Sequence, residues 1–239
     1  MAQQTGERAR YDALWEGAWG DIQRHGPVHR HTILRLLRDV AALDGVRTIL
    51  DVGCGSGEVL AALRASDRYE LSGADISERG LERARQRVPS ARFHVLDVQR
   101  EALEERFDLV TSIQVVEHLH DDAAALRNIA AMSRRWVYVS TIRGTMRPSE
   151  ASIGHVRNYA PGELEARMEA AGLRVVRSRG WGFPFYSPLY RTAAELLPGG
   201  PPEGAVTGLR RIVADALFHL YRLNVPGRGD VITVLAETR

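Results

Sequence analysis

Three glycines at alternate positions, Gly53, Gly55 and Gly57, are the feature of this sequence best suited to binding chemistry. An apolar, β-branched run at 46–52 precedes them, and a helix-like segment at 58–65 follows at once. This order predicts a strand, a tight turn and a helix. Because a turn without Cβ atoms lets a ligand approach the backbone, and the N–H groups at a helix start point outward, we expect a ligand with negative or polar groups here.

Carboxylates surround this turn in the sequence. Asp75 ends the next expected strand, about 20 residues on, where an acid can accept hydrogen bonds from ribose hydroxyls. The same placement fits a dinucleotide enzyme, but the pattern is G-x-G-x-G and Glu58 stands where the pyrophosphate fingerprint has its last glycine. Asp51 and Glu58 would repel a pyrophosphate and attract a cationic amino group. The sequence therefore favours a cationic nucleoside over NAD.

Strands and helices alternate along the first 140 residues, which predicts a doubly wound parallel sheet with helices on both faces. We expect five strands there, at 46–52, 69–75, 92–97, 107–112 and 136–140, and two more at 173–176 and 231–236. We expect helices at 28–43, 58–65, 77–89, 121–134, 161–172 and 206–223.

Three further regions complete the expected organisation. Residues 1–45 form an N-terminal helical cap segment, in which 1–10 look disordered and the aromatic-rich stretch after them forms a short helix. Residues 46–239 form the main domain. Within it, 181–229 is too long for an ordinary connection, so we expect an insertion that shapes a substrate pocket, with a turn at 198–204.

Five motifs, taken together, resemble those of class I S-adenosylmethionine-dependent methyltransferases. They are Asp51-Val-Gly-Cys-Gly-Ser-Gly57, Gly73-Ala-Asp75, Leu96-Asp-Val98, Phe107-Asp-Leu-Val110 and Val116-Glu-His-Leu119. The resemblance covers about residues 46–180 and is nearest to the small-molecule branch, which includes the ubiquinone-biosynthesis type. It implies a doubly wound, seven-stranded Rossmann-like sheet, mostly parallel with an antiparallel last strand, and a helical insertion before that strand.

The resemblance also implies S-adenosyl-L-methionine as cofactor, with S-adenosylhomocysteine as product. In it, Asp51 acts on the amino group, Asp75 holds the ribose, and Asp97 takes the adenine amine. The other cofactor residues it implies are Gly53, Cys54, Gly55, Gly57, Ile76, Val98, Gln114 and, from the preceding helix, Arg30 or His31. A single such acid could be an ordinary strand-end or helix-cap carboxylate, but three at successive strand ends favour a binding site.

Methyl transfer to a hydroxyl needs a base, because the proton must leave as the new bond forms. His118 has the best location for this role, although it could instead be a helix-start residue satisfied by backbone. His155 and Tyr159 are the second candidates, and Glu117 is more structural than catalytic. An apolar pocket wall for the acceptor comes from the aromatic side chains of the insertion, which could alternatively fill its core. These aromatic residues are Trp181, Phe183, Phe185, Tyr186 and Tyr190.

The acceptor we expect is a small, partly hydrophobic metabolite, methylated on oxygen, with carbon, nitrogen and sulfur left open. A protein of this fold that binds the cofactor without turnover is the alternative. All 32 basic residues are arginine, which excludes a lysine base or Schiff base. No basic patch interleaved with aromatics indicates a nucleic-acid substrate, and no apolar run is long enough to cross a membrane.

A cytoplasmic protein is expected, because the N-terminus lacks a signal-peptide core and the single cysteine, Cys54, forms no intramolecular disulfide. We expect no metal, since no His/Cys cluster has ligand spacing and the adjacent pair Asp121 and Asp122 suits a helix cap. The sequence leaves the oligomeric state open, a homodimer included.

Overall fold

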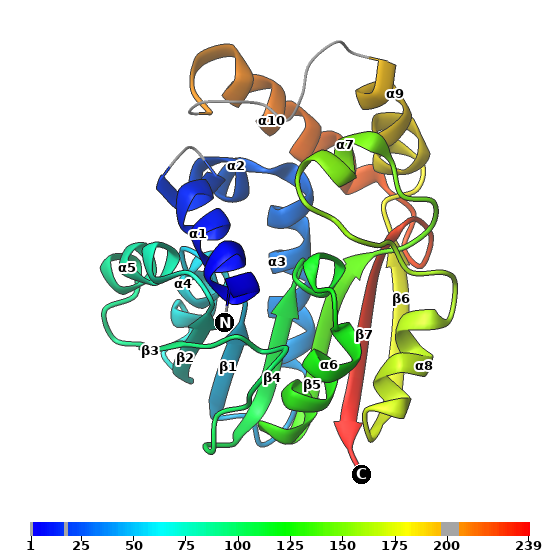
Figure 1. Ribbon diagram of the computed structural model, residues 1–239. Coiled ribbons are helices and arrows are strands. Elements are labelled where there is room, and N and C mark those ends of the chain that lie inside the picture. Colours follow the sequence, from blue (N-terminus) through cyan, green and yellow to red (C-terminus); the bar gives the residue numbers. More distant parts are fainter. Residues whose placement is uncertain (1, 17–18, 197–205) are drawn as a thin grey trace.

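A computed structural model describes residues 2–16, 19–196 and 206–239 of the chain. Its centre is a seven-stranded sheet in the order β3-β2-β1-β4-β5-β7-β6 (Figure 1). The strands are β1 (Thr48–Val52), β2 (Glu70–Asp75), β3 (Arg92–Val95), β4 (Phe107–Ile113), β5 (Ser133–Ile142), β6 (Leu173–Trp181) and β7 (Val231–Thr238). Only β7 runs antiparallel to its neighbours in this sheet. The expected fold, with its antiparallel last strand and a helical insertion before it, is confirmed.

Helices cover both faces of the sheet, so β1, β4 and β5 are buried on both sides. One face packs against α3 (Pro27–Ala41), α4 (Glu58–Arg64) and α5 (Glu78–Arg87), through an apolar cluster that includes Leu36, Leu60 and Leu81. The other face packs against α6 (Asp122–Ala131) and α8 (Glu163–Ala170), through Leu126 and Met168 among others. Buried strands of this kind read as continuous apolar runs, as in 107–113.

Two of the expected helix starts are formed by side-chain caps. The Ser77 hydroxyl accepts a hydrogen bond from the Gly80 N–H at 3.1 Å, and Asp121 Oδ1 accepts one from the Ala124 N–H at 2.8 Å. Both caps satisfy N–H groups that have no partner inside the helix. They place the loops after β2 and β4 at the carboxyl edge of the sheet.

The N-terminal segment differs from its prediction, because residues expected to be disordered belong to helix α1 (Ala2–Glu16). This helix packs on α5: Asp12 Oδ1 accepts a hydrogen bond from the Ser77 hydroxyl at 2.5 Å, and the Trp15 ring is buried beside Gly80. The polar composition of 1–10 hid this helix, since its stability comes from contacts with distant residues.

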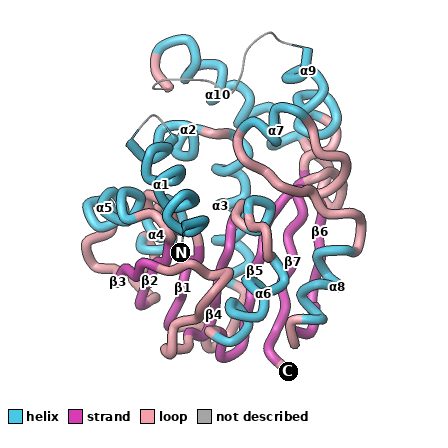
Figure 2. The backbone as a smooth tube through the Cα atoms, viewed as in Figure 1, coloured by secondary structure: helices cyan, strands magenta, loops and turns pink. Residues whose placement is uncertain are grey.

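Short helices gather beyond the carboxyl ends of the parallel strands (Figure 2). They are α2 (Trp19–His25), α7 (Pro148–Ser152), the π-type turn η2 (Phe185–Tyr190), α9 (Arg191–Leu196), α10 (Gly208–Leu220) and the 3-10 turn η3 (Tyr221–Leu223). The helix α7 was not predicted, and β6 extends to Trp181. The expected turn at 198–204 lies outside the described residues. Among the helices described, none is long and apolar enough to cross a membrane.

Candidate active site

The glycine turn after β1 adopts the left-handed backbone that its glycines permit. Gly53, Gly55 and Gly57 have φ values of 73°, 48° and 79°. The turn is also closely covered, since a β-carbon built on Gly53 would lie 2.3 Å from Val115 Cγ2, and one on Gly55 would lie 2.3 Å from Trp15 Cζ2. Any side chain larger than hydrogen at either position would therefore force these neighbours to move.

Asp75 holds this turn in place through its carboxylate. Oδ2 accepts a hydrogen bond from the Gly55 N–H at 2.8 Å, and Oδ1 accepts one from the Ser77 N–H at 2.9 Å. Burial raises the pKa of Asp75, against the opposing effect of these two donors. Each oxygen keeps a second lone pair, so Asp75 can organise the loop and still accept ribose hydroxyls.

Asp51 lies at the centre of the sheet, beside Gly73 of β2 and Thr111 of β4. Its Oδ1 accepts a hydrogen bond from the Thr111 hydroxyl at 2.7 Å, and its side chain is buried. Burial raises the pKa of Asp51 to about 7; the Thr111 hydrogen bond lowers it and the nearby Asp75 charge raises it further. A cation beside Asp51 would stabilise the carboxylate form.

Asp97 ends the strand region after β3 and is nearly fully buried. Its Oδ1 accepts a hydrogen bond from the Gln99 N–H at 3.1 Å, and Oδ2 forms an ion pair with Arg100 Nε at 3.0 Å. The next residue, Val98, is buried and its carbonyl accepts a hydrogen bond from Asn128. The three acids thus follow successive strands β1, β2 and β3 at one edge of the sheet.

A narrow cavity opens beside Asp51 and the glycine turn. Its lining residues are Gln23, His29, Asp51, Gly53, Cys54, Glu58, Val59, Ile113 and Gln114. Two buried nitrogen atoms here, Gln114 Nε2 and His29 Nε2, have no hydrogen-bond partner among the described residues. Burial lowers the pKa of His29 to about 4, so the ring is neutral near pH 7. Unpaired buried polar atoms of this kind are what a polar ligand would satisfy.

The helix α3 presents a different residue to this cavity than the sequence indicated. Arg30 ion-pairs with Asp215 at 2.6 Å, and His31 Nε2 lies 2.8 Å from the Phe218 carbonyl oxygen, so both side chains contact α10. His29 reaches the cavity instead. Sequence reasoning marked the start of this helix and missed its rotation; Gln23 of α2 carried no signal at all.

A second group of polar residues lies just beyond Gln114, in the 3-10 turn η1 (Val116–His118) and the loop after α7. The rings of His118 and His155 meet edge to face with centroids 4.7 Å apart. Burial, and secondly the neighbouring His155, lower the pKa of His118 to about 4; burial also lowers the pKa of His155. Both rings are therefore neutral near pH 7 and able to accept a proton.

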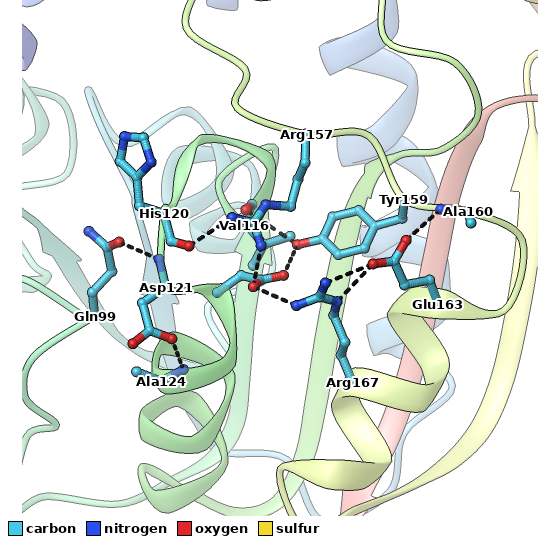
Figure 3. Close-up of polar contacts among 11 residues, drawn as sticks. Gln99, Val116, His120, Asp121, Ala124, Arg157, Tyr159, Ala160, Glu163 and Arg167 are labelled. Atoms are coloured by element: carbon cyan, nitrogen blue, oxygen red, sulfur yellow. Dashed lines mark hydrogen bonds and ion pairs between the residues drawn. The ribbon is translucent and has the colours of Figure 1, made fainter.

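Tyr159, the third candidate base, lies in a different environment. Its side chain is fully buried, and its hydroxyl donates to Asp122 Oδ2 at 2.8 Å (Figure 3). Asp122 Oδ1 also pairs with Arg157 and, at 2.8 Å, with Arg167. Burial raises the pKa of Tyr159 far above its usual value. This arrangement makes Tyr159 part of a structural network between α6 and α8.

The aromatic residues of the insertion divide into two groups. Trp181 and Tyr186 are buried and join Tyr221 in a core cluster, with the Trp181 and Tyr186 rings stacked 6.2 Å apart. Phe183 and Tyr190 are exposed by 39% and 41%. Phe185 packs against the cluster and is partly buried. The buried pair fits the alternative in which these aromatics fill the core, while the exposed pair is open to a ligand.

Comparison with known proteins agrees with the glycine turn and its three acids. A model of the methyltransferase domain family matches residues 23–178. The chain belongs to this family. It is 30% identical over 219 residues to the ubiquinone biosynthesis O-methyltransferase of Rhizobium rhizogenes, covering 75% of this chain and 85% of that one. The class I S-adenosylmethionine-dependent methyltransferases are thereby confirmed as the group that the motifs resemble.

Other relatives show how far the similarity extends. The ubiquinone biosynthesis O-methyltransferase of Bordetella parapertussis is 30% identical over 146 residues, which cover 57% of this chain and 60% of that one. The methyltransferase chain thus spans about 60% of this relative's length. Magnesium protoporphyrin IX methyltransferase from Synechocystis shares the fold, with a TM-score of 0.64, 15% identity and 99% of each chain covered.

Proposed function

We propose that this methyltransferase transfers the methyl group of S-adenosylmethionine to an oxygen of a small, partly hydrophobic acceptor. The observation that carries the proposal is the placement of Asp51, Asp75 and Asp97 around one glycine turn, with the His118 and His155 pair next along the same edge of the sheet. The names of the ubiquinone-type relatives favour oxygen as the methylated atom.

The residues fit the cofactor by charge and by shape. Asp51 would bind the cofactor's amino group, and the unpaired Gln114 and His29 nitrogens lie beside the same cavity. Asp75 would take the ribose hydroxyls, and Asp97 the adenine amine. Half-buried Ile76 and buried Val98 would pack against the adenine ring, and Gly53 to Gly57 would admit the ligand to the backbone. Arg30 or His31 would contribute only by turning away from α10.

The bound cofactor supplies an activated methyl group, and the protein aligns the acceptor and excludes water. The acceptor oxygen gains the methyl group as the sulfonium–carbon bond breaks, and the hydroxyl proton passes to the histidine pair. His118 is the first candidate base because its ring is neutral and lies nearest in sequence to Gln114. We assign the acceptor wall to the exposed Phe183 and Tyr190, with Phe185, Trp181 and Tyr186 behind them.

Residues 1–45 serve as a cap over the cofactor site in this proposal, and 181–229 as the insertion that forms the acceptor pocket. We place the enzyme in the cytoplasm, acting on a small molecule without nucleic acid or membrane as partner. Methylation at carbon, nitrogen or sulfur, or cofactor binding without turnover, is the alternative.

The test is transfer of an isotopically labelled methyl group to a panel of phenols, catechols, thiols and amines, followed by mass spectrometry. We expect a labelled methyl ether from a hydroxyl acceptor with wild type and none with Asp75→Ala. Labelled product from thiols or amines alone would refute oxygen as the acceptor atom. Tight cofactor binding with no labelled product from any acceptor would favour the binding-protein alternative.

A further inference from the structure

We propose that Glu117, His118 and His155 form a binding site for a divalent transition-metal cation. One carboxylate oxygen of Glu117 and one ring nitrogen of each histidine lie within 4.8 Å of one another. Two histidines and one carboxylate, with remaining positions open, are a donor set that Zn²⁺ and related cations accept. The sequence gave no indication of this, because His155 is 37 residues from His118 and the spacing is not that of a known metal motif.

The hydrogen bonds of the two histidines leave one nitrogen of each ring free. His118 Nδ1 lies 3.0 Å from the Gly154 carbonyl oxygen, which can only accept, so Nδ1 carries the proton and Nε2 carries the lone pair. A metal-binding histidine commonly donates its other N–H to a carbonyl or carboxylate in this way.

His155 is held in the same tautomer through a longer chain of contacts. The Asn158 Nδ2 group donates to Glu150 Oε2 at 2.7 Å, which turns the amide so that Oδ1 faces His155 Nδ1 at 3.4 Å. Glu150 is itself buried and ion-paired with Arg191 at 2.5 Å. The lone pair of His155 is thus also on Nε2, and the insertion that carries Arg191 helps to hold it there.

Glu117 supplies the negative charge that a cation needs. Its side chain is fully buried, and Oε2 accepts a hydrogen bond from the Thr141 hydroxyl at 2.7 Å. Its other oxygen, Oε1, has no hydrogen-bond partner among the described residues. A buried carboxylate oxygen without a partner is costly, and a bound cation would satisfy it.

The three donors need only a small rearrangement to bind a cation. Bond lengths of about 2.0–2.1 Å in a tetrahedral site require donor atoms about 3.3 Å apart, somewhat closer than their present separation. The exposed Arg10 guanidinium is the cation near this group, since a β-carbon on Gly154 would lie 2.4 Å from Arg10 Nη2. Arg10 would move toward solvent as the metal binds.

The site can exist whether or not the chain transfers methyl groups, so it does not rest on the proposed function. If both are correct, an open position on the cation takes the acceptor hydroxyl and ionises it, with the proton released to solvent. His118 and His155 are then ligands and not the base. Loss of transfer on chelation, restored by the cation, would distinguish this route from a histidine base.

The test is titration of chelator-treated protein with Co²⁺, followed by its visible absorption. We expect a saturable band at one Co²⁺ per chain, displaced by Zn²⁺, in the wild type and in the matched control His219→Asn, whose histidine is exposed on α10. Glu117→Gln and His155→Asn should weaken Co²⁺ binding at least tenfold.

Two measurements keep the result interpretable. Binding of S-adenosylhomocysteine and a cooperative thermal transition will show that each variant is folded, independently of the metal. Absence of a saturable band in the wild type would overturn the proposal, as would a band that both folded variants retain at wild-type affinity.

Discussion

Substituting Asp51 with asparagine should make the cofactor-free protein more stable at pH 8 while weakening the cofactor site. Asparagine is nearly isosteric, and its side-chain oxygen can still accept the hydrogen bond from Thr111, which now spans 2.7 Å. The change therefore removes a buried negative charge with little change in packing.

The magnitude follows from the pKa of Asp51. The group titrates at about 7 in the folded chain and has an ordinary value of 3.8, so between these values the folded state holds a proton that the unfolded state has lost. Stability therefore falls as pH rises from about 4 to about 7 and is unaffected by this group above that range. At 1.36 kcal/mol per pH unit, the full effect is about 4 kcal/mol, an upper value for a site that can relax.

The opposite effect is expected on binding. A cationic amino group beside Asp51 gains a charge-assisted hydrogen bond worth about 1.5–3 kcal/mol, so Asp51→Asn should lower affinity for S-adenosylhomocysteine about 10- to 100-fold. Wild-type affinity should also rise between pH 5.5 and pH 8, as the carboxylate form becomes available.

The assays are urea unfolding without cofactor at pH 5 and pH 8, and calorimetry with S-adenosylhomocysteine. Asp44→Asn, an exposed site, is the matched control and should change neither quantity. The difference between Asp51→Asn and wild type isolates Asp51 from Glu117, whose burial also raises its pKa to about 7. The reasoning fails if Asp51→Asn is no more stable than wild type at pH 8, or if it binds the cofactor equally well.

Three other changes test the placement of individual residues. Binding of S-adenosylhomocysteine should alter tryptophan emission, because Trp15 lies on Gly55; Trp15→Phe should bind the ligand but lose most of that signal, and an unchanged signal would contradict the contact. Tyr159→Phe should lower the free energy of unfolding in urea by about 1–3 kcal/mol, because Asp122 loses a buried donor, with kcat unchanged within about twofold; a large loss of kcat in folded protein would restore Tyr159 as a base. His29→Leu should weaken S-adenosylhomocysteine binding in calorimetry about fivefold while Arg30→Ala leaves it unchanged, and the reverse order would show that Arg30 turns into the site.

The cofactor side of this enzyme could be predicted from sequence because its information is local. Gly53, Gly55 and Gly57 need the left-handed backbone whatever surrounds them, and Asp75 follows its strand at a fixed spacing from the turn. Strand ends of a parallel sheet meet at one edge, so the acids come together without knowledge of side-chain packing.

The acceptor side depends on contacts between distant segments, and the sequence predicted less of it. Tyr159 looked like a base near a pocket, but its hydroxyl is held by Asp122, 37 residues earlier in the chain. Which of three adjacent residues in α3 faces the cavity depends on a helix rotation set by α10. The grouping of Glu117 with His155 likewise appears only when the loop after α7 folds back on η1.

Calorimetry of the wild-type chain with S-adenosylhomocysteine at pH 8 tests the central claim most directly. The account predicts saturable binding of one ligand per chain, lost in Asp75→Ala and retained in Asp44→Asn. No binding by the folded wild type, or binding that Asp75→Ala leaves intact, would contradict it.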